Sequence, residues 1–465
     1  MAFFFPAIFP HGMNSPSQPP PGFRNYRWII CALLFFSTTF NYLDRQVISY
    51  LQPFFCRPEA QGGFGWTNSD FSYLTSAFTG VYAAATVFAG WLIDRIGTRL
   101  GLALSLIAWS IFGILNAFAG RLLVMHIMVR SLFAVSEAGN FPASIKTVAE
   151  WFPKRERALA TSIFNAGSNA GAMIAALLVP TFMVYFGDQQ GWKWAFIITG
   201  ALGFFWLIFW FRLYHPPGKH PQLSKTEYDY IHIDDETAAD AQTGDQAAVP
   251  WLRLFGYRQL WAFIAGKFMT DGIWWFYLFW LPAYLHDQFK MTQSEVRMPT
   301  FVVYGVAILG SIYGSSIPFT LIKRGMAVYK ARMMTMLAIA VFPLTVLLTQ
   351  YFGDVNRFGH LAATLAVAMI CIGCTAHQAW SANLFTTVSD MFPKKTVASV
   401  TGIGTMAGGI GGVIIQMLQG RLRDAFSQTP QTAYLIMFIV CALSYLIAWG
   451  IMKALVPRHK PITDL

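Results

Sequence analysis

The chain has 465 residues, of which 55% are hydrophobic and only 12% are charged. Soluble domains carry about twice that share of charged residues, so a water-soluble fold could not cover 42 Phe and 16 Trp with a polar surface. The composition therefore excludes a soluble protein and predicts a chain that lies in a lipid bilayer.

The formal net charge of +11 would fit a nucleic-acid partner if the basic residues formed a stripe. They gather instead in short loops between apolar runs, which excludes that reading. Three of the five cysteines, Cys31, Cys371 and Cys441, lie inside apolar runs and provide no disulfide framework.

The N-terminal sequence MAFFFPAIFPHG is apolar, but it is short, broken by proline and without a positive n-region. It is therefore a poor signal peptide. The polar NSPSQPPPG follows it, and we expect residues 1–23 to form a disordered leader.

Twelve windows are long and apolar enough to cross a bilayer. They lie near 27–50, 70–94, 100–119, 122–150, 157–186, 192–213, 258–287, 298–322, 331–351, 360–391, 397–423 and 431–455. The sequence thus predicts an all-α integral membrane protein with six-helix halves at 24–214 and 251–456, a linker at 215–250 and a tail at 457–465. A short interfacial helix is expected in the linker near TEYDYIHI.

The distribution of basic residues predicts how the chain is oriented. With the N-terminus in the cytoplasm, 21 of the 33 Lys and Arg lie in cytoplasmic loops and tails and 8 in the opposite loops. Cytoplasmic loops carry such an excess. We therefore expect both termini in the cytoplasm, with the positive charge acting as an orientation signal.

An internal repeat relates the two halves. A shift of 240 residues aligns TVAEWFPKRERALATSIFNAGSNAGA (147–172) with TVSDMFPKKTVASVTGIGTMAGGIGG (387–412), and 9 of the 26 positions are identical. Glu150 falls on Asp390 and Glu137 falls on His377. Two halves around a site at the bilayer midplane are a known transporter architecture.

The loop between the second and third windows contains GWLIDRIGTRL, with Gly90, Asp94, Arg95, Gly97 and Arg99. This spacing resembles the loop signature of the major facilitator superfamily. A degenerate counterpart between the eighth and ninth windows contains Lys323, Arg324, Gly325 and Arg332. The resemblance implies two pseudo-symmetric six-helix halves, a monomer and no cofactor.

Four further segments resemble the anion:cation symporters of that superfamily, with the hexuronate transporters as the nearest branch. They are NYLDRQVI (41–48), SEAGNFPA (136–143), TDGIWWFYLFWLPAYL (270–285) and HQAWSANLFTTVSDMFP (377–393). Gly272 departs from the pattern, which has proline after Asp271. The resemblance implies that Arg45 binds the substrate carboxylate, that Glu137 is a proton site, and that Asp44 pairs with Arg130 as a coupling switch.

Charged residues inside a bilayer cost several kcal/mol and are functional candidates. Here they are Asp44, Arg45, Arg130, Glu137, Lys267 and Asp271, with Lys146 near the inner end of its span. Arg130 and Glu137 are two turns apart and share a helix face. Asp44 and Arg45 point about 100° apart, so each needs a partner on another helix. Lys267 and Asp271 are spaced for a local pair.

The formal charges of Arg45, Arg130, Asp44 and Glu137 sum to zero. An organic anion entering alone would leave the cavity negative in a medium of low dielectric constant, where a group usually changes protonation instead. We therefore expect one proton to enter with one anion. This expectation requires Lys146 to lie outside the cavity.

Polar side chains at matching depths in both halves are candidates for binding a hydroxyl-rich substrate. They are Tyr42, Tyr82, Asn165, Asn169, Gln378, Trp380, Ser381 and Asn383. Each of the amides and hydroxyls could equally hold helices together. His377 could titrate; with Cys371 and Cys374 it has a spacing compatible with metal ligation, but no fourth ligand is evident and no metal is expected. The glycine-rich NAGSNAGA and MAGGIGGV lack the ending of a phosphate loop and predict close helix packing.

The leading hypothesis is a proton-driven symporter of a sugar acid, a hexuronate before others, in the inner membrane of a bacterium. Aldonates, aldarates, tartrate or aromatic carboxylates would suit the same residues. A membrane enzyme is disfavoured because the sequence offers no nucleophile with a base and no cofactor loop. A passive channel is disfavoured because the halves are not equivalent. A nontransporting sensor of the same fold remains the alternative from another class.

Overall fold

The computed structural model describes residues 25–233, 251–458 and 462, which are almost wholly helical and contain no strand. The N-terminal half consists of α1 (Tyr26–Phe55), α2 (Asn68–Ile96), α3 (Thr98–Leu115), α4 (Leu123–Glu137) with α5 (Asn140–Trp151), α6 (Lys154–Phe186) and α7 (Asp188–Leu213). The C-terminal half consists of α11 (Arg258–Phe289), α12 (Arg297–Lys323), α13 (Val328–Val341) with η4 (Phe342–Leu348) and α14 (Thr349–Phe352), α16 (Ala362–Met391), α17 (Lys394–Ala425) and α18 (Pro430–Leu455). Each predicted window coincides with one helix or with consecutive helical segments.

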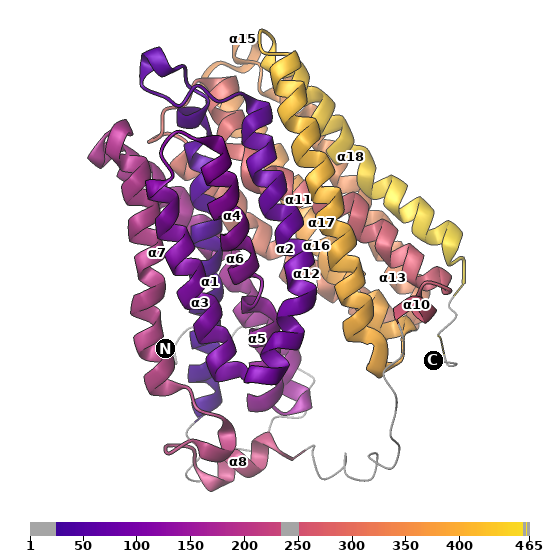
Figure 1. The fold of residues 1–465 in the computed structure, drawn as a ribbon. Helices are drawn as coiled ribbons and strands as arrows, with labels where there is room; N and C mark the ends of the chain where they lie inside the picture. Colours follow the sequence, from indigo (N-terminus) through magenta and orange to yellow (C-terminus); the bar gives the residue numbers. More distant parts are fainter. Residues whose placement is uncertain (1–24, 234–250, 459–461, 463–465) are drawn as a thin grey trace.

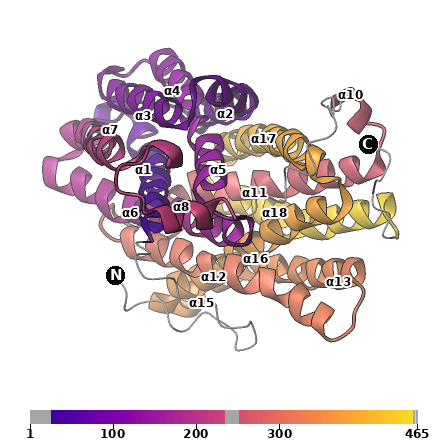
Figure 2. The same ribbon diagram turned by 90° about the horizontal axis from the view of Figure 1, so that it is seen from below.

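The two halves lie beside each other with their helices running roughly lengthwise (Figure 1). The short α8 (Lys225–Ile231) lies at the bottom of Figure 1 and α15 (Val355–Phe358) at the top, so we name the two ends of the bundle the α8 end and the α15 end. The view from below in Figure 2 separates the halves. They meet where α2 packs on α17, α6 on α12 and α1 on α11.

Nine helical segments of the described chain are long and apolar enough to cross a membrane. They include α2, α3, α7 and α18, together with most of the C-terminal half. The three remaining predicted spans correspond to α1, to the consecutive helices α4 and α5, and to α11. These three carry the six intramembrane ionic residues, which are candidates for function. α4 and α5 are each too short to cross a membrane alone, with 15 and 12 residues.

The predicted loop signature forms a tight turn between α2 and α3. Gly97 has φ of +82°, a conformation that suits glycine. Asp94 pairs with Lys146 of α5 at 2.8 Å, and Arg99 donates to the carbonyl of Phe211 at 2.9 Å. The signature therefore joins α2 and α3 to α5 and α7 at the α8 end.

The equivalent turn of the C-terminal half repeats this arrangement in part. Gly325, between α12 and α13, has φ of +89°. Arg332 pairs with Asp390 at 2.7 Å, whereas Glu150, the residue aligned with Asp390, accepts hydrogen bonds from Thr98 and Tyr214. The repeat thus preserves an acidic residue near the end of α5 and of α16, but the groups that bind this residue differ between the halves.

The linker stretch predicted to be helical forms α8. Arg27 of α1 pairs with Glu227 of α8 at 3.1 Å and with Glu156 of α6 at 2.8 Å, and Tyr230 donates to Glu156 at 2.6 Å. These bonds hold α8 on the N-terminal half. The predicted leader (1–23), residues 234–250 of the linker and most of the tail after 458 lie outside the described residues.

Hydrogen bonds between the halves gather at the α15 end. Asp424 at the end of α17 accepts the backbone N–H groups of Asn68 and Ser69 at 2.9 and 2.8 Å, so it caps the first turn of α2. Gln293 donates to the carbonyl of Tyr50 at 3.1 Å. Because a helix N-terminus attracts negative charge, the Asp424 carboxylate fastens the two halves together at this end.

Glycines of α17 allow its backbone to lie directly against α2. A Cβ at Gly412 would meet the Thr79 methyl group at 2.9 Å, and one at Gly80 of α2 would meet Val413 at 3.3 Å. Gly409 lies against Ala83 and Gly420 against Ser72. The predicted close packing of MAGGIGGV is therefore present, on the seam between the halves.

Candidate functional site: an ion pair where the halves meet

Arg45 lies in the middle of α1 and pairs with Glu137 at the end of α4. The Arg45 Nε donates to Glu137 Oε1 at 3.0 Å, and both residues are only 1% exposed. The sequence analysis required a partner for Arg45 on another helix, and the structure supplies Glu137. α4 ends at this residue, and the chain continues into α5 after Ala138 and Gly139.

Arg130 contacts the backbone of α1 and not a carboxylate of that helix. Its two Nη atoms donate to the carbonyl of Arg45 at 2.8 Å and of Asp44 at 3.4 Å. Arg130 and Glu137 thus share the face of α4 that packs on α1, as their spacing predicts. The expected Asp44–Arg130 carboxylate pair is not formed among the described residues in this conformation.

Four aromatic rings surround the guanidinium of Arg45. Its central carbon lies 4.4 Å from the ring centre of Tyr42, 4.5 Å from Tyr82, 5.4 Å from Phe78 and 5.3 Å from Trp275. Aromatic faces attract a cation, so these rings hold the guanidinium and leave its N–H edges for carboxylates. Trp275 belongs to α11 and reaches Arg45 from the other half.

Several buried polar atoms in this cluster have no hydrogen-bond partner within the described chain. They are Nη2 of Arg45, Oε2 of Glu137, Nδ2 of Asn41 and Oδ1 of Asn169. Buried polar groups are ordinarily paired, and an unpaired group calls for an explanation such as a ligand. A donor on Arg45 beside an acceptor on Glu137 would be satisfied by a bound carboxylate together with a proton.

The α6 candidates lie next to this cluster. A Cβ on Gly171 would meet the Cβ of Tyr42 at 2.8 Å and the backbone of Leu43 at 2.9 Å, so α6 touches the segment of α1 that carries Arg45. Asn169 is buried, and Asn165, one turn toward the α8 end, is exposed. This arrangement explains the NAGSNAGA pattern as close packing of α6 on α1.

The α16 candidates divide into two sets. Gln378 and Ser381 are half-buried. Trp380 stacks edge-on against Tyr445 of α18, and Asn383 donates to the carbonyl of Gly314 on α12 at 2.8 Å. Trp380 and Asn383 therefore hold helices of the C-terminal half together in this conformation, and their role in substrate binding stays a prediction.

His377, predicted as the counterpart of Glu137, is buried within the C-terminal half. Its Nδ1 lies 2.8 Å from the Tyr445 hydroxyl, and its ring stacks on Trp274 at 5.2 Å. The described residues contain no group of three His, Cys, Asp or Glu side chains placed to hold a metal ion. His377 thus has a hydrogen-bonded aromatic environment that differs from the ionic environment of Glu137.

Two other cations lie apart from Arg45. Lys267 pairs with Asp271 at 2.6 Å, one turn along α11, and lies over the Phe385 ring at 4.4 Å. Lys146 pairs with Asp94 at the α8 end, where its side chain is 30% exposed. Lys146 therefore stands outside the Arg45 cluster, as the charge argument required.

Gly272, where the resemblance had implied proline, lies at the contact between α11 and α17. A Cβ at this position would meet Ile415 at 2.8 Å and the Gly411 carbonyl oxygen at 2.9 Å. α11 runs unbroken through this point. The glycine is therefore explained by close packing, and the helix needs no bend there.

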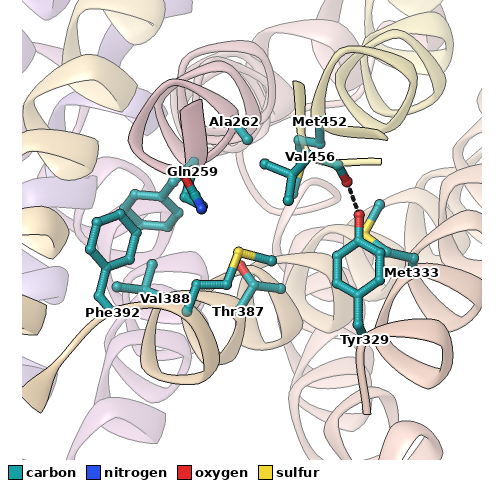
Figure 3. Close-up of a pocket in the computed structure, with 11 residues that line it drawn as sticks. Gln259, Ala262, Tyr329, Met333, Thr387, Val388, Phe392, Met452 and Val456 are labelled. Atoms are coloured by element: carbon teal, nitrogen blue, oxygen red, sulfur yellow. Dashed lines mark hydrogen bonds between the residues drawn. The ribbon is translucent and has the colours of Figure 1, made fainter. Parts of the chain in front are cut away.

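A small pocket in the C-terminal half lies away from Arg45. It has a volume of about 10 Å³ and is lined by α11, α13, α16 and α18, with Ala262, Met333, Val388 and Met452 among its side chains (Figure 3). That volume holds about one water molecule. The pocket is too small and too apolar for an organic anion.

Sequence reasoning missed Phe78 and Trp275 as neighbours of Arg45. The sequence of the aromatic run WWFYLFW (274–280) does not reveal which ring faces the other half. Trp274 stacks on His377, whereas the adjacent Trp275 lies by Arg45. The helical phase of α11 against α1 separates these two roles, and only the packed structure provides it.

Two helical halves that enclose buried ionic residues at their contact are the architecture of a membrane transporter. The chain belongs to the Major Facilitator Superfamily, whose sequence model matches residues 34–416. This membership confirms the predicted all-α, multi-pass membrane fold of two six-helix halves. The family consists of membrane transporters and not of enzymes.

Individual proteins resemble the chain over nearly its full length. It is 28% identical to the hexuronate transporter of Escherichia coli K12 over an alignment of 444 residues. This alignment covers 95% of this chain and 96% of that transporter. It is also 26% identical to the D-galactonate transporter of Escherichia coli O6:H1 over 439 residues, an alignment that covers 93% of this chain and 97% of that transporter.

A solved structure resembles the fold. A bacterial homologue of the human lysosomal transporter Spinster, in an inward-facing and unoccupied conformation, has a TM-score of 0.69 and 17% identity. It covers 93% of this chain and 99% of that chain. At this identity the likeness concerns the fold alone.

Proposed function

We propose that the chain is a proton-coupled symporter that imports a sugar-acid anion, a hexuronate before others, by alternating access. The site lies in the inner membrane of a bacterium, and the α8 end with both termini faces the cytoplasm. The single observation that carries the proposal is the buried Arg45–Glu137 pair with an unpartnered donor on Arg45.

The substrate class rests on the chemistry of Arg45 and on the names of the relatives. A guanidinium presents a planar fork that binds a carboxylate through two parallel hydrogen bonds. The Nε edge of Arg45 is bound to Glu137, and Nη2 has no partner in the described structure. A substrate carboxylate at that edge would compete with Glu137 for the same cation. Relatives named for hexuronate and galactonate transport support a sugar acid.

Proton coupling follows from the charges. When a substrate carboxylate takes the place of Glu137 on Arg45, the Glu137 carboxylate is left buried without its cation. A buried, unpaired charge is unfavourable enough that the group takes up a proton. Asp44, whose carboxylate lies by the Thr199 and Trp109 side chains and forms no ion pair among the described residues, is a second acceptor. One anion and one proton therefore enter together, with no change in the net charge of the site.

The direction of access in this conformation follows from where the halves touch. Three contacts between the halves close the α15 end. They join Asp424 to the first turn of α2, Gln416 to Thr75, and Gln293 to the carbonyl of Tyr50. Asn165, the exposed candidate of α6, lies one turn closer to the α8 end than the buried Asn169. The conformation is therefore interpreted as open to the cytoplasm, and rocking of the halves would open the α15 end to the outside.

Uptake into proteoliposomes tests this function. Labelled glucuronate, galacturonate and galactonate are supplied with and without an inward proton gradient, while a trapped dye reports the internal pH. We expect saturable uptake of a sugar acid, accumulation only with the gradient, and internal acidification during uptake. One pH unit corresponds to about a tenfold accumulation per proton. Uptake without acidification would overturn the proton coupling.

The alternatives are decided by the same vesicles. Preference for an aldonate, an aldarate, tartrate or an aromatic carboxylate over the hexuronates would change the substrate and retain the mechanism. Substrate binding without flux in either direction would indicate the nontransporting sensor.

A further inference from the structure

Trp275 is held at the contact between the halves by α17. Its carbonyl accepts a hydrogen bond from Gln416 Nε2 at 3.0 Å. The Gln416 Oε1 accepts one from the Trp280 indole at 2.6 Å and lies 3.2 Å from the Thr75 hydroxyl of α2. Gln416 is fully buried. This amide therefore fixes the α11 backbone at Trp275 and joins it to the N-terminal half.

The indole of Trp275 occupies a space that glycine leaves open. A Cβ at Gly412 would approach the indole Cδ1 at 2.8 Å and the Thr79 methyl group at 2.9 Å. The indole also lies edge-on to Phe78 and Tyr82, with ring centres 6.2 and 6.3 Å away. It is thus packed between α17 and α2 and directed toward Arg45.

The contact between Trp275 and Arg45 depends on the closure of the α15 end. Trp275 moves with α17 because Gln416 holds its backbone, whereas Arg45, Tyr42, Tyr82 and Phe78 belong to the N-terminal half. Opening the α15 end must break the bond between Gln416 and Thr75, and the indole then leaves with the C-terminal half. Arg45 would retain three aromatic neighbours and lose the fourth.

We propose that Trp275 is a positioning residue that orients the free edge of Arg45 toward substrate only while the α15 end is closed. The inference rests on the proposed function, since it assigns Arg45 to the substrate carboxylate. Its consequence is sidedness: the indole supports binding of a sugar-acid anion from the α8 end and has no contact with Arg45 when substrate binds from the α15 end. Sequence and family resemblance assign no such role to this residue.

Side-specific exchange kinetics test the proposal. Exchange of labelled for unlabelled glucuronate or galactonate, at equal pH on both sides, is measured in oriented vesicles with substrate held saturating on one face and varied on the other. For Trp275→Leu we expect KM at the α8 face to rise roughly tenfold, the loss of a well-formed cation–π contact, with KM at the other face and kcat within about twofold of wild type. Trp275→Phe should recover most of the loss, since a phenyl ring retains the quadrupole.

Two further variants separate positioning from general loosening. Gly412→Ala keeps the indole but displaces it, so it should raise KM at the α8 face in the same direction. Trp449→Leu removes an indole that donates to the Met333 carbonyl elsewhere in the C-terminal half, and it should leave KM on both faces unchanged. Equal KM shifts on both faces for Trp275→Leu, or the same shift for Trp449→Leu, would overturn the proposal.

A measurement without substrate separates this inference from the proposed function. Phenylglyoxal added at the α8 face modifies accessible arginine, and mass spectrometry reports the rate at Arg45. Trp275→Leu should raise that rate several-fold and Trp449→Leu should not. If wild type exchanges none of the sugar acids, the proposed function fails, while the modification rate still decides whether Trp275 covers Arg45; an unchanged rate would refute the inference.

Discussion

The N-terminal half holds Arg45, Glu137, Asp44 and Arg130 between two helices, whereas Lys267 and Asp271 of the C-terminal half pair along one helix. Arg45 must reach from α1 to α4 for its carboxylate, while Lys267 finds its partner one turn away. Glu137 has an unpartnered oxygen within the described structure. The difference indicates that the N-terminal half supplies the ions that change partners, and that the C-terminal half supplies the packing against which they do so.

The largest expected effect comes from Arg45→Lys. A lysine cannot present two parallel donors to a carboxylate, and we expect kcat/KM for uptake to fall roughly 100-fold, the scale of a lost bidentate charge-assisted pair. Lys267→Arg, the matched change in the other half, keeps a cation beside Asp271 and should lower uptake far less than Arg45→Lys does. Undiminished uptake by Arg45→Lys would remove the assignment of Arg45 to substrate.

Glu137→Gln should separate exchange from accumulation. The amide can still lie beside Arg45 but cannot carry the transported proton. We expect exchange of labelled for unlabelled substrate at a rate within about tenfold of wild type, with no accumulation driven by a proton gradient. A variant that still accumulates substrate would transfer the proton role to Asp44 or His377.

The ion pair of the C-terminal half should behave as a packing element. Lys267→Met leaves the half-buried Asp271 without its cation and should lower the thermal midpoint by about 5 °C. The double variant Lys267→Met/Asp271→Asn removes both charges and should recover most of that loss and retain uptake. If the double variant is stable but transports nothing, the pair belongs to the site and the contrast between the halves fails.

A smaller effect is expected where the halves are fastened. Asp424→Ala removes the carboxylate that caps α2 from the other half, which should favour opening of the α15 end by about 1 kcal/mol, or roughly fivefold. Reaction of a cysteine placed at Ser72 with a membrane-impermeant thiol reagent measures the opening. Asp70→Ala is the control, because Asp70 caps the same helix through Thr67 within its own half; equal labelling of both variants would contradict the role of Asp424 in closure.

Much of the fold could be predicted because apolar length and turn residues are local signals. The twelve windows, the 240-residue repeat and the close packing of the glycine-rich segments were all readable in this way. The ionic residues were also readable, since a charge in an apolar run is conspicuous. The break after Glu137 was not, because Ala138 and Gly139 occur equally well inside membrane helices.

The partners of the site residues required the packed structure. Sequence spacing places Arg130 and Glu137 on one face, but it could not distinguish a bond to the Asp44 carboxylate from the observed bonds to backbone carbonyls. Trp380 and Asn383 were chosen for their chemistry, and the helical phase of α16 turns them toward α18 and α12. Contacts between helices depend on rotation about each axis, which composition alone does not determine.

The small residues along α2 and α17 bear on how fast the protein can change shape. Where Gly409 meets Ala83, Gly412 meets Thr79 and Gly420 meets Ser72, small residues of the two helices touch directly. Such surfaces can separate without any rotamer having to change. The energy barrier between conformations would then be set by a few hydrogen bonds between the halves, such as those from the first turn of α2 to Asp424. Substitutions at those few positions could change the turnover rate and leave the interior unchanged.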